Sequence, residues 1–246
     1  MVLGLALAAP ASAASWKPDV GAARAYARDR GGSVSFTVRT PRHAYGYRGD
    51  RVARSASVVK AMLMVSYLNR RSVRGRRLRA GDHALLSPMI RRSDNGAASR
   101  VRDIVGNGAL AHLARRAHMR RFSTARSWGD TQTTTADQTR LFLRIDRFVV
   151  RRHRATALRL LGSITRRQRW GIAKAQPPGW SLYFKGGWGD GDGEVDHQVA
   201  LLTRGGQRVS VGIMTTANPS KAYGDQTLRG VARRLLRELR PDSVPR

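Results

Sequence analysis

Alternating hydrophobic and polar positions mark strands at both ends of the chain. Residues Ser33–Arg39 alternate with a period of two, and residues 43–48 can pair with them across a turn at residues 40–42. Gly205-Gly206 predicts a tight turn between the last two of three C-terminal strands. Those three strands are predicted at residues 181–186, 195–204 and 207–216. The pattern therefore predicts one antiparallel sheet built from both ends of the chain.

The long stretch between these strands has a helical pattern. Residues 58–68 are apolar on nearly every side, so we expect this helix to be buried at the centre of the molecule. An arginine-rich loop is expected at residues 74–79. The other predicted helices cover residues 18–28, 83–92, 97–105, 109–118, 135–149 and 222–240. These elements predict an α/β (α+β) fold, in which helices pack an antiparallel sheet and an all-helical lobe is inserted between its two halves.

The length of 246 residues suits one domain with two lobes. The apolar start followed by Ala11-Ser12-Ala13 predicts a signal peptide over residues 1–13. We expect residues 14–246 to form a single domain, with a sheet lobe at about 14–56 and 159–246 and a helical lobe at about 57–158. The leader predicts a protein outside the cytoplasm, either secreted or in the cell envelope. The chain has no cysteine, so its stability must come from packing.

The charge is strongly positive, because 41 Arg and 5 Lys stand against 14 Asp and 2 Glu, for a net charge of +30. Such a charge is typical of a protein with a polyanionic partner, such as nucleic acid, an anionic cell-wall polymer or acidic lipid. It is also compatible with a solvated surface rich in arginine, because arginine pairs are spread along the whole chain. No motif that reads nucleic-acid bases is present. We therefore expect no specific nucleic-acid partner, and a weak, salt-sensitive affinity for anionic cell-wall polymer.

Candidate chemistry begins at Ser57 and Lys60, which lie on one face of the apolar helix, one turn apart. At this spacing the amine can take the proton of the hydroxyl and turn a weak nucleophile into a strong one. Alternatively, Ser57 is a helix N-cap and Lys60 a solvated helix residue. The second interpretation is weakened by the neighbours of Lys60, since an unpaired ammonium among apolar residues is costly.

Two further motifs follow in the chain. Ser93-Asp94-Asn95 can serve as a helix cap or turn, or as a proton relay next to an amide that binds a substrate carbonyl. Lys185-Gly186-Gly187 ends a predicted strand, where glycine either makes a turn or lets a substrate lie close to the backbone.

In this order the three motifs resemble those of the penicillin-recognising serine hydrolases, and class A β-lactamases most of all. The segment from Lys185 to Asp190 resembles the lysine strand of that family and the turn that follows it. The segment from Thr133 to Gln138 resembles the threonine-rich helix start after the family's omega loop. The resemblance covers most of the chain, from about Ser33 to Arg240, and implies that residues 14–246 are a single β-lactamase-like catalytic domain.

The resemblance also implies a role for each matching residue. Ser57 would be the nucleophile, Lys60 its base, Ser93 the proton shuttle and Lys185 the anchor of the substrate carboxylate. Asn95 would bind the substrate, with Gly187 and Trp188 beside it. The backbone amides of Ser57 and Trp188 would form the oxyanion hole. The implied substrate is a β-lactam or a D-alanyl peptide, acted on by a monomer.

Three departures from the family pattern are visible, and only the last bears strongly on the expected activity. Gly186 stands where the family usually carries Thr or Ser, a minor departure because that side chain faces away from the ligand in the family. The interval from Ser57 to Ser93 is short, which implies loss of helical material from the inserted lobe. The omega loop of class A enzymes carries a Glu that activates the deacylating water. This chain has only Glu194 and Glu238, and neither lies between Ser93 and Thr133. Asp130 is either a shorter substitute or a loop aspartate paired with an arginine. We therefore expect acylation, with slow turnover, as the resemblance to D-alanyl-D-alanine peptidases and penicillin-binding proteins also implies.

Other chemistries find less support. Residues 190–196 resemble the start of an EF-hand loop, but Val195 occupies the position that needs Gly and Leu201 the position of the bidentate Glu. The six histidines show no spacing typical of a metal site, so neither a metal nor a cofactor is expected. The G-x-S-x-G motif of α/β-hydrolases is absent.

Overall fold

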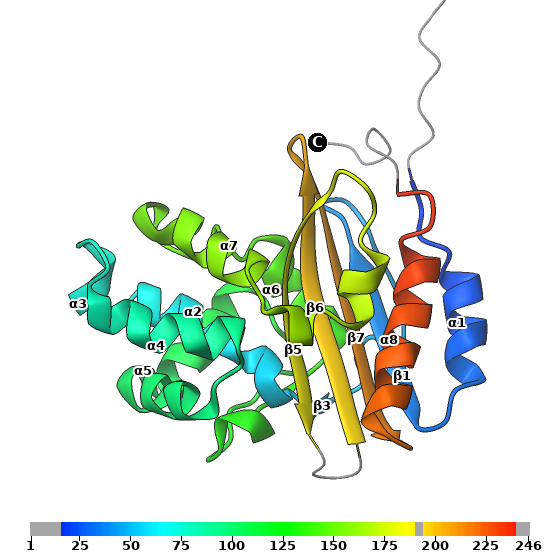
Figure 1. Ribbon diagram of the computed structural model, residues 1–246, viewed down its shortest axis with the longest axis horizontal. Helices are drawn as coiled ribbons and strands as arrows, with labels where there is room; N and C mark the ends of the chain where they lie inside the picture. Colours follow the sequence, from blue (N-terminus) through cyan, green and yellow to red (C-terminus); the bar gives the residue numbers. More distant parts are fainter. Residues whose placement is uncertain (1–15, 190–193, 240–246) are drawn as a thin grey trace, which may run out of the picture.

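A five-stranded antiparallel sheet stands at the centre of the molecule, with helices on both faces (Figure 1). The computed structural model describes residues 16–189 and 194–239, so the predicted leader and Asp190 lie outside the described residues. The strand order is β2-β1-β7-β6-β5. The strands are β1 (Ser33–Arg39), β2 (Ala44–Tyr47), β5 (Ser181–Gly189), β6 (Glu194–Arg204) and β7 (Gln207–Asn218). A separate pair joins β3 (Ala53–Arg54) to β4 (Gln132–Thr133).

This arrangement confirms the predicted fold class. β1 from the N-terminal part pairs directly with β7 from the C-terminal part, with Phe36 opposite Ile213. The turn between β6 and β7 lies at Gly205 and Gly206, whose φ angles of +52° and +87° are left-handed and favour glycine. β5 lies at one edge of the sheet, so one side of this strand is left without a neighbouring strand. That edge faces the inserted helices.

Helices form a layer on each face of the sheet (Figure 1). On one face lie α1 (Val20–Arg28) and α8 (Lys221–Leu235), which contact each other. α6 (Thr135–Leu143) packs against β1 and β7. The remaining helices are α2 (Lys60–Leu68), α3 (Arg71–Arg74), α4 (Ala80–Arg91), α5 (Asn95–Arg116) and α7 (Arg154–Gly162). In the described part of the chain, no helix combines the length and apolar character needed to cross a membrane.

The most apolar predicted helix is also the most buried one. Every residue of α2 is buried, and α2 contacts α4, α5 and α7. A 3-10 turn, η1 (Ala56–Val59), leads directly into α2. A helix enclosed on all sides has little freedom to shift, so it is a rigid support for side chains at either of its ends.

Four helix predictions need correction, and the structure contains one further helix. The helix predicted at 135–149 ends at Leu143, because Arg208 donates to the Leu143 carbonyl over 2.8 Å and pairs with Asp146. The helix predicted at 222–240 ends at Leu235. α7 was not predicted. The helices predicted at 97–105 and 109–118 form one assigned helix, α5, which Gly106 interrupts with a φ of +72°.

Candidate active site

An open cleft of about 480 Å³ lies along the edge strand β5. The opposite wall comes from the segment before α2 and from the 3-10 turn η2 (Trp128–Asp130). Residues of all three motifs meet at or beneath this cleft. Ser57, Asn95 and Trp188 line it, while Lys60 and Lys185 are fully buried next to it.

Ser57 enters the cleft from η1, at the start of the buried helix. Its side chain is 8% exposed. The preceding residue, Ala56, has a φ of +44°, which is a left-handed conformation that residues other than glycine seldom adopt. Such strained residues are most often found at functional sites, where the surrounding structure holds them in place.

Lys60 is anchored by acceptors across the helical lobe. Its Nζ donates to the Ser93 carbonyl over 2.6 Å, to Asn95 Oδ1 over 2.7 Å and to Ser93 Oγ over 3.2 Å. Burial lowers the pKa of Lys60 to about 7, and the carboxylate of Asp94 opposes this shift. An amine with this pKa is partly neutral near neutral pH and can accept a proton. Ser57 is not among these described hydrogen-bond partners of Lys60.

Ser93 connects the two buried lysines. Lys185 Nζ donates to Ser93 Oγ over 3.0 Å and to the Gly186 carbonyl over 2.6 Å. Burial lowers the pKa of Lys185 well below its usual value, and the positive charge of Lys60 lowers it further. Because both amines donate to the same oxygen, the hydroxyl hydrogen of Ser93 can point toward a substrate. Ser93 has a φ of +58°, which is also left-handed.

Asn95 is the first residue of α5 and owes its position to the residue before it. Asp94 is the N-cap, and its carboxylate accepts from the Ala97 amide over 2.6 Å. Asn95 then lines the cleft and accepts from Lys60. The triplet from Ser93 to Asn95 therefore combines both interpretations of the motif, because it caps a helix and also contacts the buried amine.

Gly187 lets β5 pass very close to the helix that carries Ser57. A Cβ at Gly187 would lie 2.7 Å from the Ser57 amide nitrogen and 2.9 Å from that of Val58. Real Cβ atoms do not approach this closely, so glycine is required here. The first amides of a helix lack partners within the helix. The approach of β5 thus brings the amide of Ser57 beside the strand that carries Trp188.

His197 is a site residue that the sequence did not reveal. It is fully buried on β6, and its Nε2 lies 2.9 Å from the Arg54 carbonyl. Its Nδ1 accepts from the Thr215 amide over 3.3 Å, so Nε2 must carry the hydrogen that the Arg54 carbonyl accepts. Burial lowers the pKa of His197 and favours this neutral form. His197 therefore fastens the chain three residues before Ser57 to the sheet.

Trp128 is the second site residue without a signal in the sequence. The Lys60 Nζ lies 4.5 Å from the centre of the Trp128 ring, within cation–π distance. The indole nitrogen of Trp128 donates to Ser99 Oγ over 3.2 Å and fixes the ring in place. Nearby, Asp130 pairs with Arg54 over 3.4 Å, which favours the interpretation as a loop aspartate. In the part of the chain that the structure describes, no carboxylate forms an ion pair with Lys60.

Trp170 fills the space beside Gly186. A Cβ at Gly186 would lie 3.3 Å from the Trp170 ring, so Trp170 covers the position where the family carries Thr or Ser. Trp170 packs edge to face against Trp188, with 5.8 Å between ring centres. Lys221 lies 3.7 Å from the centre of the Trp170 ring and 3.0 Å from Asp196 Oδ1. The departure at Gly186 is thus accompanied by a local repacking with aromatic residues.

No metal site appears among the described residues, where no three His, Cys, Asp or Glu side chains cluster. The segment that resembles an EF-hand connects two antiparallel strands, β5 and β6, and residues 190–193 of it lie outside the described part.

The sheet, its helical layers and the serine near buried lysines define a β-lactamase/transpeptidase-like fold, and solved structures agree. A β-lactamase from Sphaerobacter thermophilus DSM 20745 is 22% identical with a TM-score of 0.76, over 91% of this chain and 98% of that chain. A class A β-lactamase from Mycobacterium abscessus is 19% identical with a TM-score of 0.76, over 90% and 99%. A mutant of PBP-A, in an acyl-enzyme complex with penicillin G, is 16% identical with a TM-score of 0.74, over 90% and 95%.

The family itself follows from the sequence comparison. The model of the β-lactamase enzyme family matches residues 74–239, which is more than half of the chain. The chain therefore belongs to the β-lactamase enzyme family. This match includes Ser93, Asn95 and Lys185, whereas Ser57 and Lys60 precede it and are placed by the structure. A comparison with proteins of curated function found no match. Family membership supports a serine hydrolase of the β-lactamase type.

Proposed function

We propose that the protein is an exported serine acyl-hydrolase of the class A β-lactamase type, which forms an acyl-Ser57 intermediate with β-lactams or D-alanyl peptides and releases it slowly. The observation that carries this proposal is the buried amine of Lys60, three residues after Ser57, with a pKa lowered to about 7. Neither a solvated surface lysine nor a plain helix cap needs such an environment. The protein would act as a monomer and without a cofactor.

Acylation would begin with transfer of a proton from Ser57 to Lys60, for which the two side chains must come into hydrogen-bond contact. The neutral amine of Lys60 accepts the proton of Ser57, and Ser57 Oγ forms a bond to the substrate carbonyl carbon. The amides of Ser57 and Trp188 would stabilise the negative charge on the carbonyl oxygen, and one such donor contributes about 3 to 4 kcal/mol in known cases. Lys185 would hold the substrate carboxylate through its charge, and Asn95 would bind a substrate carbonyl.

Collapse of the intermediate would break the carbon–nitrogen bond. Ser93 would give its proton to the leaving nitrogen, and the ammonium of Lys60 would return a proton to Ser93, since Lys60 Nζ lies 3.2 Å from Ser93 Oγ. The products of this step are an acyl-Ser57 ester and a neutral Lys60. The proton balance closes without any group beyond the substrate, Ser57, Lys60 and Ser93.

Deacylation would be slow because no described carboxylate is placed to activate water beside Lys60. The ring of Trp128 covers the amine from the η2 segment, and Asp130 in the same segment pairs with Arg54. An aromatic ring cannot accept a proton from water. The acyl-enzyme would therefore accumulate, as in a penicillin-binding D-alanyl-D-alanine peptidase-like protein, which is the alternative form of this proposal.

Covalent labelling tests the acylation half of the proposal. Wild-type protein incubated with a fluorescent penicillin should gain the mass of one penicillin, and Ser57→Ala should gain none. An adduct that survives Ser57→Ala would refute the assignment of the nucleophile. If the wild type is not labelled, and salt-dependent cosedimentation with cell walls persists in Ser57→Ala, the protein is instead a catalytically silent domain that binds anionic wall polymer.

Replacement of Trp128 tests the deacylation half. Trp128→Glu places a carboxylate next to Lys60, and we expect the label to leave at least about tenfold faster, the scale of general-base catalysis. Trp128→Phe keeps an aromatic cover and should leave the rate of label release within about twofold. Intact mass measured after removal of free penicillin gives both rates. Rapid, multiple turnover of nitrocefin by the wild type would show that another group activates water.

A further inference from the structure

A second hollow, of about 600 Å³, lies at the other end of α2 and is strongly basic. We call it the arginine hollow and define it by the five arginines in its lining. They come from the end of α2, from α3, from α5 and from the segment around the start of α7. They are Arg70, Arg74, Arg116, Arg147 and Arg154. His112 also lines the hollow, and no acidic residue does so among the described residues.

The guanidinium groups of the arginine hollow lack anionic partners among the described residues, where none of the five forms an ion pair. Arg154 donates to the Val149 carbonyl over 3.1 Å, and Arg116 lies 5.7 Å from the centre of the Phe148 ring. Five like charges around one hollow repel each other, and an anion placed there would remove that repulsion. The high arginine content alone does not produce this arrangement, because Arg54 is the only arginine among the described residues that line the cleft at Ser57.

Hydrogen bonds hold the walls of the hollow in place. The side chain of Asn69 donates to the Phe148 carbonyl over 2.7 Å and accepts from the Val150 amide over 3.1 Å. These bonds hold the segment that carries Arg147 against α2. Ser66, on α2, is 8% exposed and lines the hollow, and its hydroxyl has no hydrogen-bond partner among the described residues. This hydroxyl is enclosed by protein, so Ser66 belongs to the packed wall of the hollow and the arginines supply its donors.

The basic surface continues beyond this hollow. A neighbouring hollow of about 400 Å³ shares Arg116, Arg147 and Phe148 with it and adds Arg39, Arg140 and Arg144. A third, of about 240 Å³, shares Arg144 and Arg147 with the second and includes Arg208. Arg140 and Arg208 have carboxylate partners, whereas the five arginines of the first hollow have none among the described residues. A linked row of basic hollows fits a linear anion with repeated charges better than a single small one.

From this geometry we propose that the arginine hollow binds a linear phosphodiester polymer of the cell envelope, such as a poly(glycerol phosphate) chain. The guanidinium fork matches phosphate oxygens in two parallel hydrogen bonds. A membrane surface fits less well, since the exposed large hydrophobic residues of the described chain, Val52 and Ile104, do not line the hollow. Nucleic acid fits less well because Phe148, the one aromatic ring among the described lining residues besides His112, faces Arg116 rather than offering an open stacking platform.

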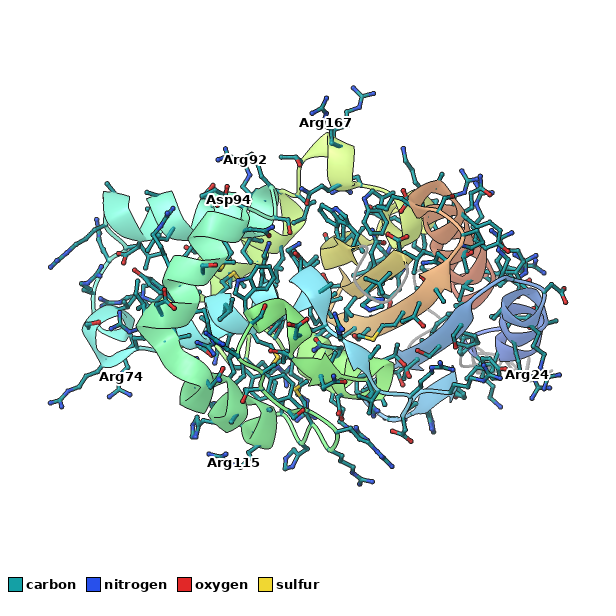
Figure 2. All side chains as sticks on the ribbon, turned by 90° about the horizontal axis from the view of Figure 1, so that it is seen from below. Arg24, Arg74, Arg92, Asp94, Arg115 and Arg167 are labelled. Carbon is teal, nitrogen blue, oxygen red and sulfur yellow. The ribbon has the colours of Figure 1, made fainter. Side chains whose placement is uncertain are left out.

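A charge-matched pair of variants tests the proposal. Arg74→Gln/Arg147→Gln removes two exposed arginines of the hollow, whereas Arg24→Gln/Arg167→Gln removes two exposed arginines elsewhere. Figure 2 shows Arg24, Arg74 and Arg167 at separate places on the outside of the molecule. Binding of fluorescent poly(glycerol phosphate) to the full chain is measured by anisotropy at several salt concentrations. We expect the affinity to fall about tenfold in the hollow variant and less than about twofold in the control.

Two further readouts make the result specific. The log–log slope of affinity against salt should become shallower by about 0.7 for each phosphate that the hollow variant no longer neutralises. Ser66→Ala should leave both the affinity and that slope unchanged, since the hydroxyl is enclosed and no charge is removed. An equal decrease in the hollow and control variants would overturn the proposal in favour of diffuse attraction. Tighter binding of an oligonucleotide with the same number of phosphates would overturn the identity of the polymer.

The same variants can refute polymer binding at the hollow without refuting the proposed acyl-transfer activity, and the reverse. Ser57→Ala should bind the polymer as the wild type does, and the hollow variant should be labelled by fluorescent penicillin at the wild-type rate. Labelling of the hollow variant also shows that it is folded, so a decrease in polymer binding cannot be attributed to unfolding. If Ser57→Ala fails both to bind the polymer and to be labelled, the polymer binds at the cleft and the hollow is not its site.

Discussion

The cleft at Ser57 and the arginine hollow lie at opposite ends of α2 and use positive charge in different ways. Lys60 and Lys185 in the cleft are fully buried, and burial lowers the pKa of both. Arg74 and Arg147 in the hollow are exposed, and arginine keeps its charge at any physiological pH. A chain with 41 Arg but only 5 Lys thus has a lysine at position 60, where the proposed mechanism needs a cation that can become neutral. The comparison indicates that residue choice follows the chemistry of each site rather than the bias in composition.

The largest effect is expected when a lysine of the cleft is replaced by an arginine, the residue type of the hollow. Lys60→Arg keeps the charge but removes a base that can become neutral. We expect acylation by fluorescent penicillin to fall about 1,000-fold, within the range for removal of a general base. Stopped-flow or time-resolved gel labelling measures this rate, and thermal unfolding shows whether the variant is folded. A variant that keeps more than about a tenth of the wild-type rate would show that neutralisation of residue 60 is not needed.

The pH profile offers a second contrast. Because the pKa of Lys60 is lowered to about 7, the amine is mostly protonated below that pH and mostly neutral above it. The acylation rate should therefore rise about tenfold between about pH 6 and about pH 8 and then level off. Polymer binding at the arginine hollow does not involve Lys60 and should not follow this profile. A flat acylation profile would contradict the role of Lys60 as base.

Stability should also respond differently at the two sites. The pKa of Lys60 is lower in the folded chain than its ordinary value of 10.5, so the folded state binds fewer protons between about pH 7 and that value. The free energy of unfolding contributed by Lys60 therefore increases as pH rises through this window, and at lower pH Lys60 destabilises the fold. Lys60→Met should raise the melting temperature at about pH 6, by roughly 2–4 °C for each kcal/mol gained. Arg147→Met, at an exposed position, is the matched control and should change it little.

The smallest effect is expected when arginines of the hollow are replaced by lysines. Arg74→Lys/Arg147→Lys keeps both charges and removes only the two-pronged hydrogen bonds to phosphate. We expect poly(glycerol phosphate) affinity to fall by about twofold to threefold, with an unchanged salt slope. Fluorescence anisotropy at fixed salt measures this difference. A decrease as large as that of the double glutamine variant would show that guanidinium geometry, rather than charge, dominates binding.

Most of the sheet could be predicted from the sequence, because its strands have an alternating pattern of hydrophobic and polar residues and are bounded by turn residues. The observed β1 has the predicted range, Ser33–Arg39. Its five inner residues are buried, its two end residues are half-buried, and a turn follows the strand. β5 and β7 each extend beyond the prediction, where pairing with β6 continues the ladder past the period-two pattern. The end of α6 could not be predicted, because Arg208 from β7 determines it through contacts with Leu143 and Asp146.

The candidate site was predictable in its ordered motifs but not in its three-dimensional contacts. Ser57, Lys60, Ser93 and Lys185 are recognisable because their types and spacing suggest acyl transfer, and the structure brings Lys60, Ser93 and Lys185 into hydrogen-bond contact. The contact between Trp128 and Lys60 has no such signal, since it joins two segments with no shared pattern. The arginine hollow could not be predicted either, because its arginines come from separate elements and look evenly spread along the chain.

The burial of α2 has a further consequence for how the protein would work at a surface. A helix of nine residues is roughly 14 Å long, so the nucleophile and the hollow are separated by about one helix length of rigid core. The two sites share no lining residue among those that the structure describes, so both can be occupied at once. A polymer strand held in the hollow would act as a tether. Tethering of this kind raises the effective concentration of a nearby substrate to about the millimolar range, without any change in the chemistry at Ser57.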